Sequence, residues 1–141
     1  ALADDFAVLA QQKTIQFSST IATSSAKANI SAAHLRSAVW NILDNALKFT
    51  PDGGWVKLDA ALVNQHIQLS ITDSGIGIAA EEMPKLFTKF HRGTSTMQYQ
   101  YEGTGIGLYA TKLVIERLGG TITAASQLGH GSTFTIQLPM L

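Results

Sequence analysis

Two alternating apolar segments with a very short connection between them limit the folds open to this chain. Every second residue is apolar over residues 56–62 and again over residues 67–71, and Asn64-Gln65 lies between the two segments. A period of two residues is typical of a strand with one buried face, and so short a connection joins antiparallel neighbours. We therefore predict a β-hairpin, around which the remaining elements have to be arranged.

The sequence on either side of this hairpin predicts three helices. Helical spacing of apolar residues and end signals predict helices over residues 1–12 and 31–50, with Ser31 as the cap of the second. A third helix would open within residues 103–108 and end at Gly119-Gly120. The apolar face of this third helix would consist of Ile106, Ala110, Leu113, Val114 and Leu118.

Further strands complete the predicted sheet. Alternation predicts a strand over residues 13–19 and a closing hairpin over residues 121–125 and 132–138. A short helical segment is expected over residues 81–87. This order of elements predicts one α+β domain over residues 1–141, a two-layer sandwich with helices on one face of a mixed, mostly antiparallel sheet.

The composition suits one globular domain and excludes several kinds of site. Among 141 residues, 45% are apolar, and ten basic residues balance ten acidic ones, so the charge favours neither nucleic acid nor an acidic membrane surface. The chain has no cysteine, which excludes disulfides and any cysteine-based metal site or nucleophile. No apolar run is long enough to cross a bilayer, and no signal-peptide pattern opens the sequence.

The helix predicted over residues 31–50 separates polar from apolar side chains. At about 100° per residue, Asn41, Asn45 and Lys48 fall within about 60° of one another. The apolar side chains lie on a separate face and belong to Leu35, Val39, Ile42, Leu43, Ala46 and Phe49. Two amides and one cation suit a hydrated divalent ion carried by phosphates, because Mg²⁺ takes few protein ligands and keeps its waters. An amphipathic helix whose polar face only meets water explains the same pattern.

A carboxylate follows the second strand of the hairpin, in the stretch Asp73-Ser-Gly75-Ile-Gly77. A carboxylate accepts hydrogen bonds, so the amino group of adenine is a suitable donor for Asp73. Gly75 and Gly77 would let a flat base come close, because glycine has no side chain. An Asx-type turn, in which the glycines serve backbone geometry, is the alternative, and for this stretch alone it is the simpler explanation.

A glycine-rich turn leads into the third helix over residues 103–108. Amide groups at such a turn can approach an anion, and the start of a helix adds positive potential. No Lys-Ser or Lys-Thr pair follows, so the stretch is not a Walker A loop. An ordinary loop-to-helix turn accounts for the pattern equally well.

The polar stretch 88–103 is long for a connection and would form a lid. Phe87 and Phe90 would act as its apolar hinge. Arg92 lies just beyond the hinge, where a guanidinium could meet a terminal phosphate when the lid closes. A solvated charge is the alternative for this arginine.

Taken together, these stretches resemble the catalytic, ATP-binding domain of sensor histidine kinases, in the wider group with gyrase, Hsp90 and MutL. In the family's order, the N, G1, F and G2 boxes resemble residues 41–49, 73–77, 87–90 and 103–108. Residues 129–134 are similar to the family's final hairpin, so the resemblance covers essentially the whole chain. It implies the Bergerat α/β sandwich with an ATP lid, which agrees with the predicted order of elements.

The resemblance implies roles for residues at the phosphates. Asn45, helped by Asn41, would hold Mg²⁺ against the phosphates of ATP. Lys48 would contact a phosphate, and Arg92 would join it in stabilising the transferred group.

The resemblance also implies how adenine is bound. Phe49 would lie against the ring, Asp73 would bind the amino group directly and through water, and Thr133 would lie nearby. The full implied nucleotide-binding set is Asn41, Asn45, Lys48, Phe49, Asp73, Gly75, Gly77, Ile78, Gly103, Thr104, Gly105, Ile106, Gly107, Leu108 and Thr133.

Asn41 bears on the reaction. ATP-hydrolysing members resembling gyrase and Hsp90 carry glutamate where this chain has Asn41. An amide does not accept a proton usefully, so the residue favours transfer to another acceptor over hydrolysis. The implied function is transfer of the γ-phosphoryl group of Mg·ATP to a histidine in two-component signalling. A non-catalytic nucleotide-sensing or protein-interaction module is the alternative.

The acceptor histidine is expected on another domain. The four histidines of the chain are His34, His66, His91 and His130, and His34 lies on the helix of Asn41, too close to reach nucleotide bound there. In the family, the acceptor lies on a dimeric helical hairpin, to which residues 1–12 would connect. The implied partners are that domain and a response-regulator receiver domain, without nucleic acid. We expect the isolated domain to be monomeric. We also expect it to be cytoplasmic, either by itself or as the cytoplasmic part of a membrane-anchored sensor.

Overall fold

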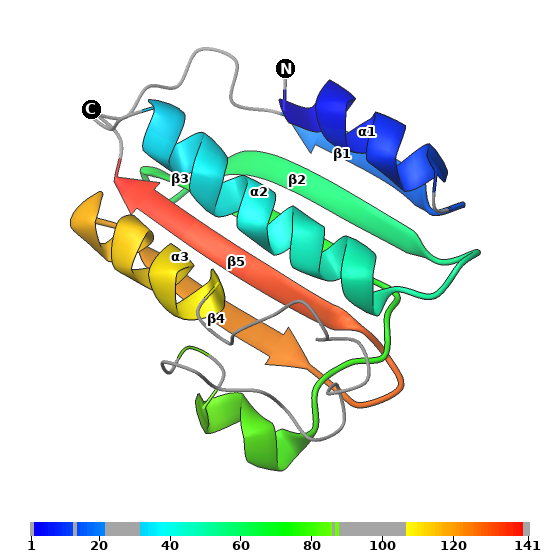
Figure 1. Ribbon diagram of the computed structural model, residues 1–141. Helices are drawn as coiled ribbons and strands as arrows, with labels where there is room; N and C mark the ends of the chain where they lie inside the picture. The colour runs from blue at the N-terminus through cyan, green and yellow to red at the C-terminus, as the bar shows by residue number, and fades with distance from the viewer. Residues whose placement is uncertain (1, 13, 22–31, 86, 88–106, 140–141) are drawn as a thin grey trace.

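The computed structural model describes residues 2–12, 14–21, 32–85, 87 and 107–139 (Figure 1). Its elements in chain order are α1 (Leu2–Gln12), β1 (Gln16–Ile21), α2 (Ala32–Phe49), β2 (Trp55–Val63), β3 (His66–Asp73), the 3-10 helix η1 (Ala80–Lys85), α3 (Gly107–Arg117), β4 (Thr121–Ser126) and β5 (Ser132–Pro139). Both hairpins are confirmed, and the short helical segment forms as a 3-10 helix.

The strands form one sheet in the order β1-β2-β3-β5-β4. β1 pairs with β2 in parallel, whereas the other neighbouring strands are antiparallel, so the expected mixed, mostly antiparallel sheet is confirmed. Asn64 and Gln65 connect β2 to β3 with φ angles of 50° and 63°. This left-handed conformation suits a two-residue hairpin, because it matches the twist of the flanking strands.

The first strand starts later than the sequence pattern predicted. Ile15 donates its backbone N–H to the carbonyl of Ala10 at 2.9 Å, and Thr14 donates to that of Gln11 at 3.1 Å. Thr14 also has a positive φ of 62°. The two residues therefore close the end of α1, as is common at helix C-termini, and β1 occupies Gln16–Ile21 instead of residues 13–19.

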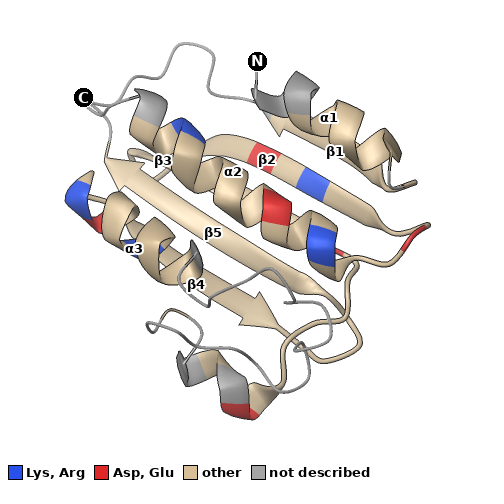
Figure 2. Cartoon of the chain, viewed as in Figure 1, with Lys and Arg blue, Asp and Glu red and all other residues tan. Residues whose placement is uncertain are grey.

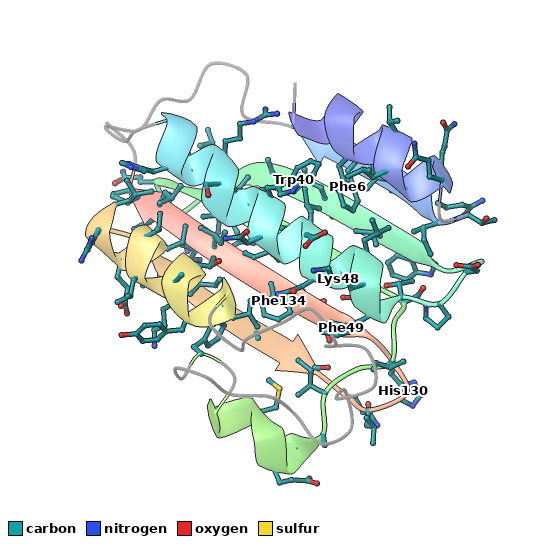
Figure 3. The ribbon with its side chains drawn as sticks, in the orientation of Figure 1. Phe6, Trp40, Lys48, Phe49, His130 and Phe134 are labelled. Atoms are coloured by element: carbon teal, nitrogen blue, oxygen red, sulfur yellow. The ribbon has the colours of Figure 1, made fainter. Side chains whose placement is uncertain are left out.

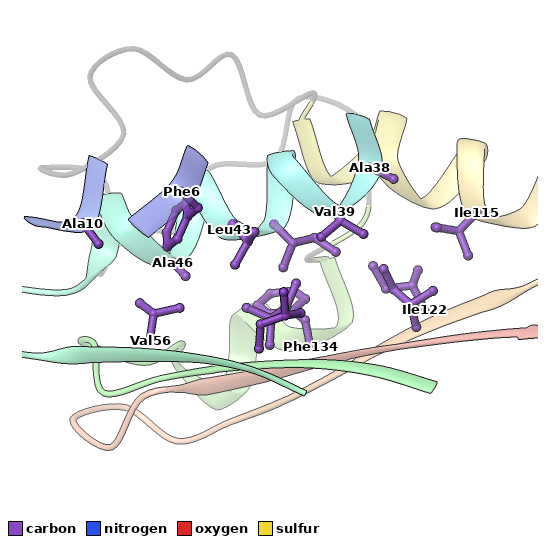
Figure 4. Packing of buried hydrophobic residues seen from close by; sticks show 14 of the residues in the cluster. Phe6, Ala10, Ala38, Val39, Leu43, Ala46, Val56, Ile115, Ile122 and Phe134 are labelled. Carbon is purple, nitrogen blue, oxygen red and sulfur yellow. The ribbon is translucent and has the colours of Figure 1, made fainter. Parts of the chain in front are cut away.

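Helices α1, α2 and α3 cover one face of the sheet, and their apolar side chains meet those of the strands (Figures 1 and 4). The strand pattern decides which residues enter this core. On β5, Ile136 and Leu138 are fully buried, whereas Thr135 and Gln137 lie on the opposite face. The expected two-layer sandwich is confirmed.

The buried face of α3 differs from the predicted one. Leu113 is 37% exposed, whereas Ile115 is fully buried and Thr111 is 1% exposed. Val114 and Leu118 pack against the core as predicted. The prediction missed the apolar Ile115, and the stripe facing α2 also contains Thr111, whose hydroxyl accepts a hydrogen bond from Asn41. Ile106, also assigned to that face, lies outside the described residues.

Helix α1 packs at the β1 edge of the sheet. Its Phe6 is fully buried, with ring centroids 4.8 Å from Phe17 and 5.9 Å from Trp40 (Figure 3). In the part of the chain that the structure describes, no helix is both long enough and apolar enough to cross a membrane.

Candidate functional site

The polar face of α2 lines one side of the candidate site. Asn41, Asn45 and Lys48 are all half-buried and lie at helical spacing within the single helix Ala32–Phe49. Figure 3 places Lys48 and Phe49 at the C-terminal end of this helix, on the same side of the sheet as Phe134. The predicted stripe of two amides and one cation is therefore present.

Two neighbours constrain this stripe. The side-chain amide nitrogen of Asn41 donates to the hydroxyl of Thr111 on α3 at 3.3 Å, which directs the carbonyl oxygen of Asn41 away from Thr111. Lys48 forms an ion pair with Asp44 at 3.1 Å, in the part of α2 where Figure 2 shows adjacent basic and acidic residues. Because both partners are about one third exposed, solvent screens the pair and lets Lys48 exchange partners.

The carboxylate of Asp73 ends β3 in a buried position, with 6% of the residue exposed. Its Oδ1 accepts the backbone N–H of Gly75 at 2.8 Å, and the backbone N–H of Ser132 also donates to this carboxylate. Burial raises the pKa of Asp73, and the two backbone hydrogen bonds oppose that rise. The bond to Gly75 is an Asx-type turn, so the simpler of the two sequence explanations is present in the structure.

Residues 74–78 form a loop held on several sides. The N–H of Ile76 donates to the carbonyl of Phe49 at the end of α2, at 3.1 Å. The N–H of Gly129 donates to the carbonyl of Ile76 at 2.7 Å, which ties the loop to the β4–β5 turn. The N–H of Ile78 donates to the hydroxyl of Ser126 at 2.8 Å. The loop is thus positioned by three separate elements.

The glycines of this loop are required by protein packing. The explanation from the sequence that they let a flat base come close did not include this role. A Cβ atom at Gly75 would lie 2.5 Å from the carbonyl oxygen of Phe49. At Gly77, φ is +74° and a Cβ atom would collide with the carbonyl oxygen of Gln127. Both positions therefore require glycine because protein backbone approaches them closely.

The threonine predicted beside adenine, Thr133, lies on the opposite face of the sheet from Asp73. In the β3–β5 pairing, Ser132 is opposite Asp73 and Thr133 is opposite Thr72. The hydroxyl of Thr133 donates to that of Thr72 at 3.2 Å, on the face that the helices do not cover. Since neighbouring strand residues point to opposite faces, the hydroxyl next to Asp73 belongs to Ser132.

Ser132 and Ser126 are neighbours of the candidate site that the sequence prediction did not include. The hydroxyls of these two serines are 2.8 Å apart. The strand pattern contained the signal for Ser132, because it has the same parity as the buried Phe134 and Ile136. Ser126 has the same parity as the buried Ile122 on β4, but its contact with Ile78, far away in the sequence, had no signal in that pattern.

The remaining predicted residues are described only in part. Phe90, Arg92, Gly103, Thr104, Gly105 and Ile106 lie outside the described residues. Gly107 is the first residue of α3, and Leu108 packs against the core. Phe87 contacts Phe134 edge-to-face, with ring centroids 6.2 Å apart, which is compatible with its predicted hinge position.

The described residues contain no cluster of three or more His, Cys, Asp or Glu side chains suited to a metal ion. The donors available near the phosphate side are the amide oxygens of Asn41 and Asn45. Such neutral oxygens fit a Mg²⁺ ion that keeps most of its waters and binds mainly through phosphates.

Three histidines are described. His34 is exposed on the first half of α2, and His66 contacts the carbonyl of Asn64 at 2.9 Å. His130 is exposed in the β4–β5 turn (Figure 3). His91 lies outside the described residues.

The described residues form an α+β sandwich with amides on α2 and a buried carboxylate at the end of β3. Residues 30–141 match the family described as histidine kinase-, DNA gyrase B-, and HSP90-like ATPase. The chain belongs to this family, and within it to the catalytic, ATP-binding domains of the sensor histidine kinase type.

Relatives and solved structures support this assignment. The chain is 33% identical over 130 residues to an uncharacterized sensor-like histidine kinase of Rhizobium meliloti, covering 92% of this chain and 25% of that protein. It is 41% identical over 105 residues to the circadian input-output histidine kinase CikA of Synechococcus elongatus, covering 74% of this chain and 14% of that protein. The mycobacterial sensor histidine kinase MprB superposes with a TM-score of 0.83 at 29% identity, covering 99% and 93% of the two chains. The chain thus spans a quarter or less of these two full-length relatives.

Proposed function

We propose that the chain binds Mg·ATP between α2, the 74–78 loop and the start of α3, and transfers the γ-phosphoryl group to a histidine on a separate dimerisation domain. The observation that carries the transfer step is the amide at position 41, held by Thr111 in the place where hydrolysing members have glutamate. Without a base next to the phosphates, water is not activated, and the nucleophile has to come from elsewhere.

The adenine end of the proposed site rests on Asp73. Its buried carboxylate already accepts two backbone N–H groups and retains lone pairs for the amino group of adenine. Phe49, half-buried at the end of α2, would lie against the ring. Gly75, Gly77 and Ile78 would shape the pocket through the fixed path of the loop.

The phosphate end of the proposed site rests on α2 and on the turn that precedes α3. Asn45 and Asn41 would hold Mg²⁺, which neutralises charge on the phosphates as the γ-phosphoryl group leaves. Lys48 would exchange Asp44 for a phosphate oxygen. The backbone N–H groups of residues 103–108 and the guanidinium of Arg92 would complete the charge stabilisation.

The partners in this proposal are a dimeric helical hairpin that carries the acceptor histidine and a response-regulator receiver domain that takes the phosphoryl group onward. Helix α1 would connect the domain formed by residues 1–141 to the hairpin. His34 is exposed at the start of α2, His66 contacts the carbonyl of Asn64, and His130 is exposed in the β4–β5 turn. We therefore look for the acceptor histidine outside these described segments.

Calorimetry with Mg·ATP tests the site. We expect Asn45→Ala and Asp73→Asn each to abolish measurable binding. Asn45→Ala removes a contact at the phosphate end of the nucleotide, and Asp73→Asn removes one at the adenine end. Gln68→Ala is the matched control, since it removes only a hydrogen bond of 3.0 Å to Gln137 on the uncovered face of the sheet. Retained affinity in both site variants would rule out this assignment.

A further inference from the structure

The hydroxyl of Ser126 joins three backbone segments at one point. Ser126 ends β4, and its Oγ lies 2.8 Å from the N–H nitrogen of Ile78, 2.9 Å from the carbonyl oxygen of Gly131 and 2.8 Å from the hydroxyl oxygen of Ser132. It therefore connects the 74–78 loop to the first residue of β5.

The hydrogen bonds of these groups can be assigned by elimination. A serine hydroxyl has one proton to donate and two lone pairs to accept with. The N–H of Ile78 can only donate to Ser126, and the carbonyl of Gly131 can only accept from it. The carbonyl of Gly131 also accepts the N–H of Gln127, but at 3.4 Å, so we assign the proton of Ser126 to the 2.9 Å bond with Gly131. With that assignment, Ser132 is the donor in the contact between the two hydroxyls.

This assignment determines what Ser132 offers to a ligand. Ser132 lies opposite Asp73 in the β3–β5 pairing, and it is 8% exposed. With its proton directed at Ser126, its hydroxyl has only lone pairs left for the base site. Asp73 is an acceptor as well, so the adjacent groups that line the base site both accept hydrogen bonds.

We propose that Ser126 is a positioning residue for base selection: it holds the Ser132 hydroxyl as an acceptor, so that the site favours a 6-amino purine over a 6-oxo purine. The inference rests on the proposed nucleotide site. We place the Ser132 hydroxyl opposite the 6-substituent and not opposite N1, where the proton of a 6-oxo purine would favour an acceptor. At that position a 6-amino group, or a water that it orders, donates to the surface, whereas a 6-oxo group brings a third acceptor to it. Without Ser126, the Ser132 hydroxyl is free to rotate and donate to the oxygen.

Competition between ATP and inosine triphosphate tests this role. The two nucleotides differ in the 6-amino and 6-oxo groups and in the proton on N1. We expect Ser126→Ala to lower the ratio of the two affinities by about tenfold, the typical effect of one hydrogen bond. Gln137→Ala, which removes a side-chain hydrogen bond between β5 and β3 on the uncovered face, should leave the ratio unchanged.

A double-mutant cycle with Ser132→Ala separates orientation from general loosening of the loop. If Ser126 acts through the Ser132 hydroxyl, Ser126→Ala should have no further effect on the ratio once Ser132 is alanine. Equal weakening of both nucleotides by Ser126→Ala, or independent effects of the two substitutions on the ratio, would overturn the inference. If the unmodified chain binds ATP but Ser126→Ala leaves the ratio of ATP to inosine triphosphate affinity unchanged, only this inference fails. If the unmodified chain does not bind ATP, the proposed function fails as well.

Discussion

Asn41 reaches from α2 to the buried Thr111 of α3, and this contact determines which of its amide atoms faces the candidate phosphate site. The nitrogen donates to Thr111, so the oxygen is the atom left for a cation. Asp73 is constrained in a comparable way, because two backbone N–H groups hold its carboxylate where burial would otherwise favour the neutral acid. In both cases a neighbouring group decides what the polar side chain can bind.

Replacing the partner of Asn41 should weaken binding of Mg·ATP. Thr111→Val keeps the shape of the buried side chain but cannot accept the hydrogen bond from Asn41. We expect the affinity to fall about threefold to tenfold, as one neutral hydrogen bond contributes about 0.5–1.5 kcal/mol. Calorimetry measures this, with Thr121→Val on the exposed start of β4 as the control. An unchanged affinity in Thr111→Val would show that the orientation of Asn41 is irrelevant to binding.

The ionisation of Asp73 should respond to nucleotide. In the free chain, its pKa lies above the ordinary value of 3.8 because of burial. Its contribution to stability is therefore complete below pH 3.8 and is lost as the pH rises through the folded-state pKa. An amino group that donates to the carboxylate favours the charged form, so ADP should lower this pKa. Titration of the carboxyl carbon by NMR, with and without ADP, checks both statements; a pKa that ADP leaves unmoved would contradict the adenine contact.

At the level of elements, the 74–78 loop is held between the end of α2 and the β4–β5 turn. Phe49 accepts from Ile76, and Ile76 accepts from Gly129, so the loop bonds to both neighbours through one residue. Gly77 fits against Gln127 only because it has no side chain. The position of the base site therefore depends on backbone packing as much as on side chains.

Gly77→Ala should displace the loop from the turn. The substitution combines a positive φ of 74° with a collision at the carbonyl of Gln127. Gly53→Ala is a matched control, because Gly53 has φ +90° and nothing within 4 Å of its Cβ position. A left-handed alanine alone costs about 1–2 kcal/mol, so we expect thermal unfolding to show a larger loss for Gly77→Ala, with weaker ADP binding. Equal losses of stability and unchanged ADP affinity would contradict a positioning role for this contact.

The elements that the sequence predicted correctly are those set by local pattern. Alternation located both hairpins, and helical spacing located α2 with its buried Val39, Ile42 and Leu43. The wrong start of β1 came from the local turn that ends α1, whereas the wrong face of α3 depended on a tertiary contact. The buried stripe of α3 contains Thr111 because Asn41 provides a partner for its hydroxyl.

Within the candidate site, the sequence predicted the residues of α2 and Asp73 but not their neighbours. Thr133 was assigned to adenine from a motif, although strand parity places Ser132 on that face. Ser126 could not be inferred at all, because it meets Ile78 across 48 residues of sequence. Such contacts follow from the packing of the turn on the loop, which no local pattern encodes.

In the molecule as a whole, helix α1 and the proposed nucleotide site lie in different regions of the sandwich. α1 packs beside β1, at one edge of the sheet, whereas the proposed site lies between α2, the 74–78 loop and the start of α3 (Figure 1). Phe6 anchors α1 through Phe17 and Trp40. Stability and nucleotide affinity should therefore be separable.

Phe6→Ala should destabilise the domain without changing the site. Removing this fully buried ring leaves a cavity, with an expected loss of about 3–5 kcal/mol. Val8→Ala is the control, because Val8 on the same helix is 56% exposed. Thermal unfolding measures stability, and calorimetry at a temperature where both variants are folded measures ATP affinity. A fall in affinity that parallels the loss of stability would show that the two regions are coupled.

The fate of the γ-phosphoryl group tests the central claim most directly. The chain would be mixed with Mg²⁺ and γ-labelled ATP, alone and together with the proposed dimeric helical hairpin. We expect almost no steady release of phosphate by the chain alone, because Asn41 supplies no base. With the hairpin present, we expect label that is acid-labile and alkali-stable on a histidine. Steady phosphate release by the chain alone, or binding of ATP with no labelled histidine, would contradict the account.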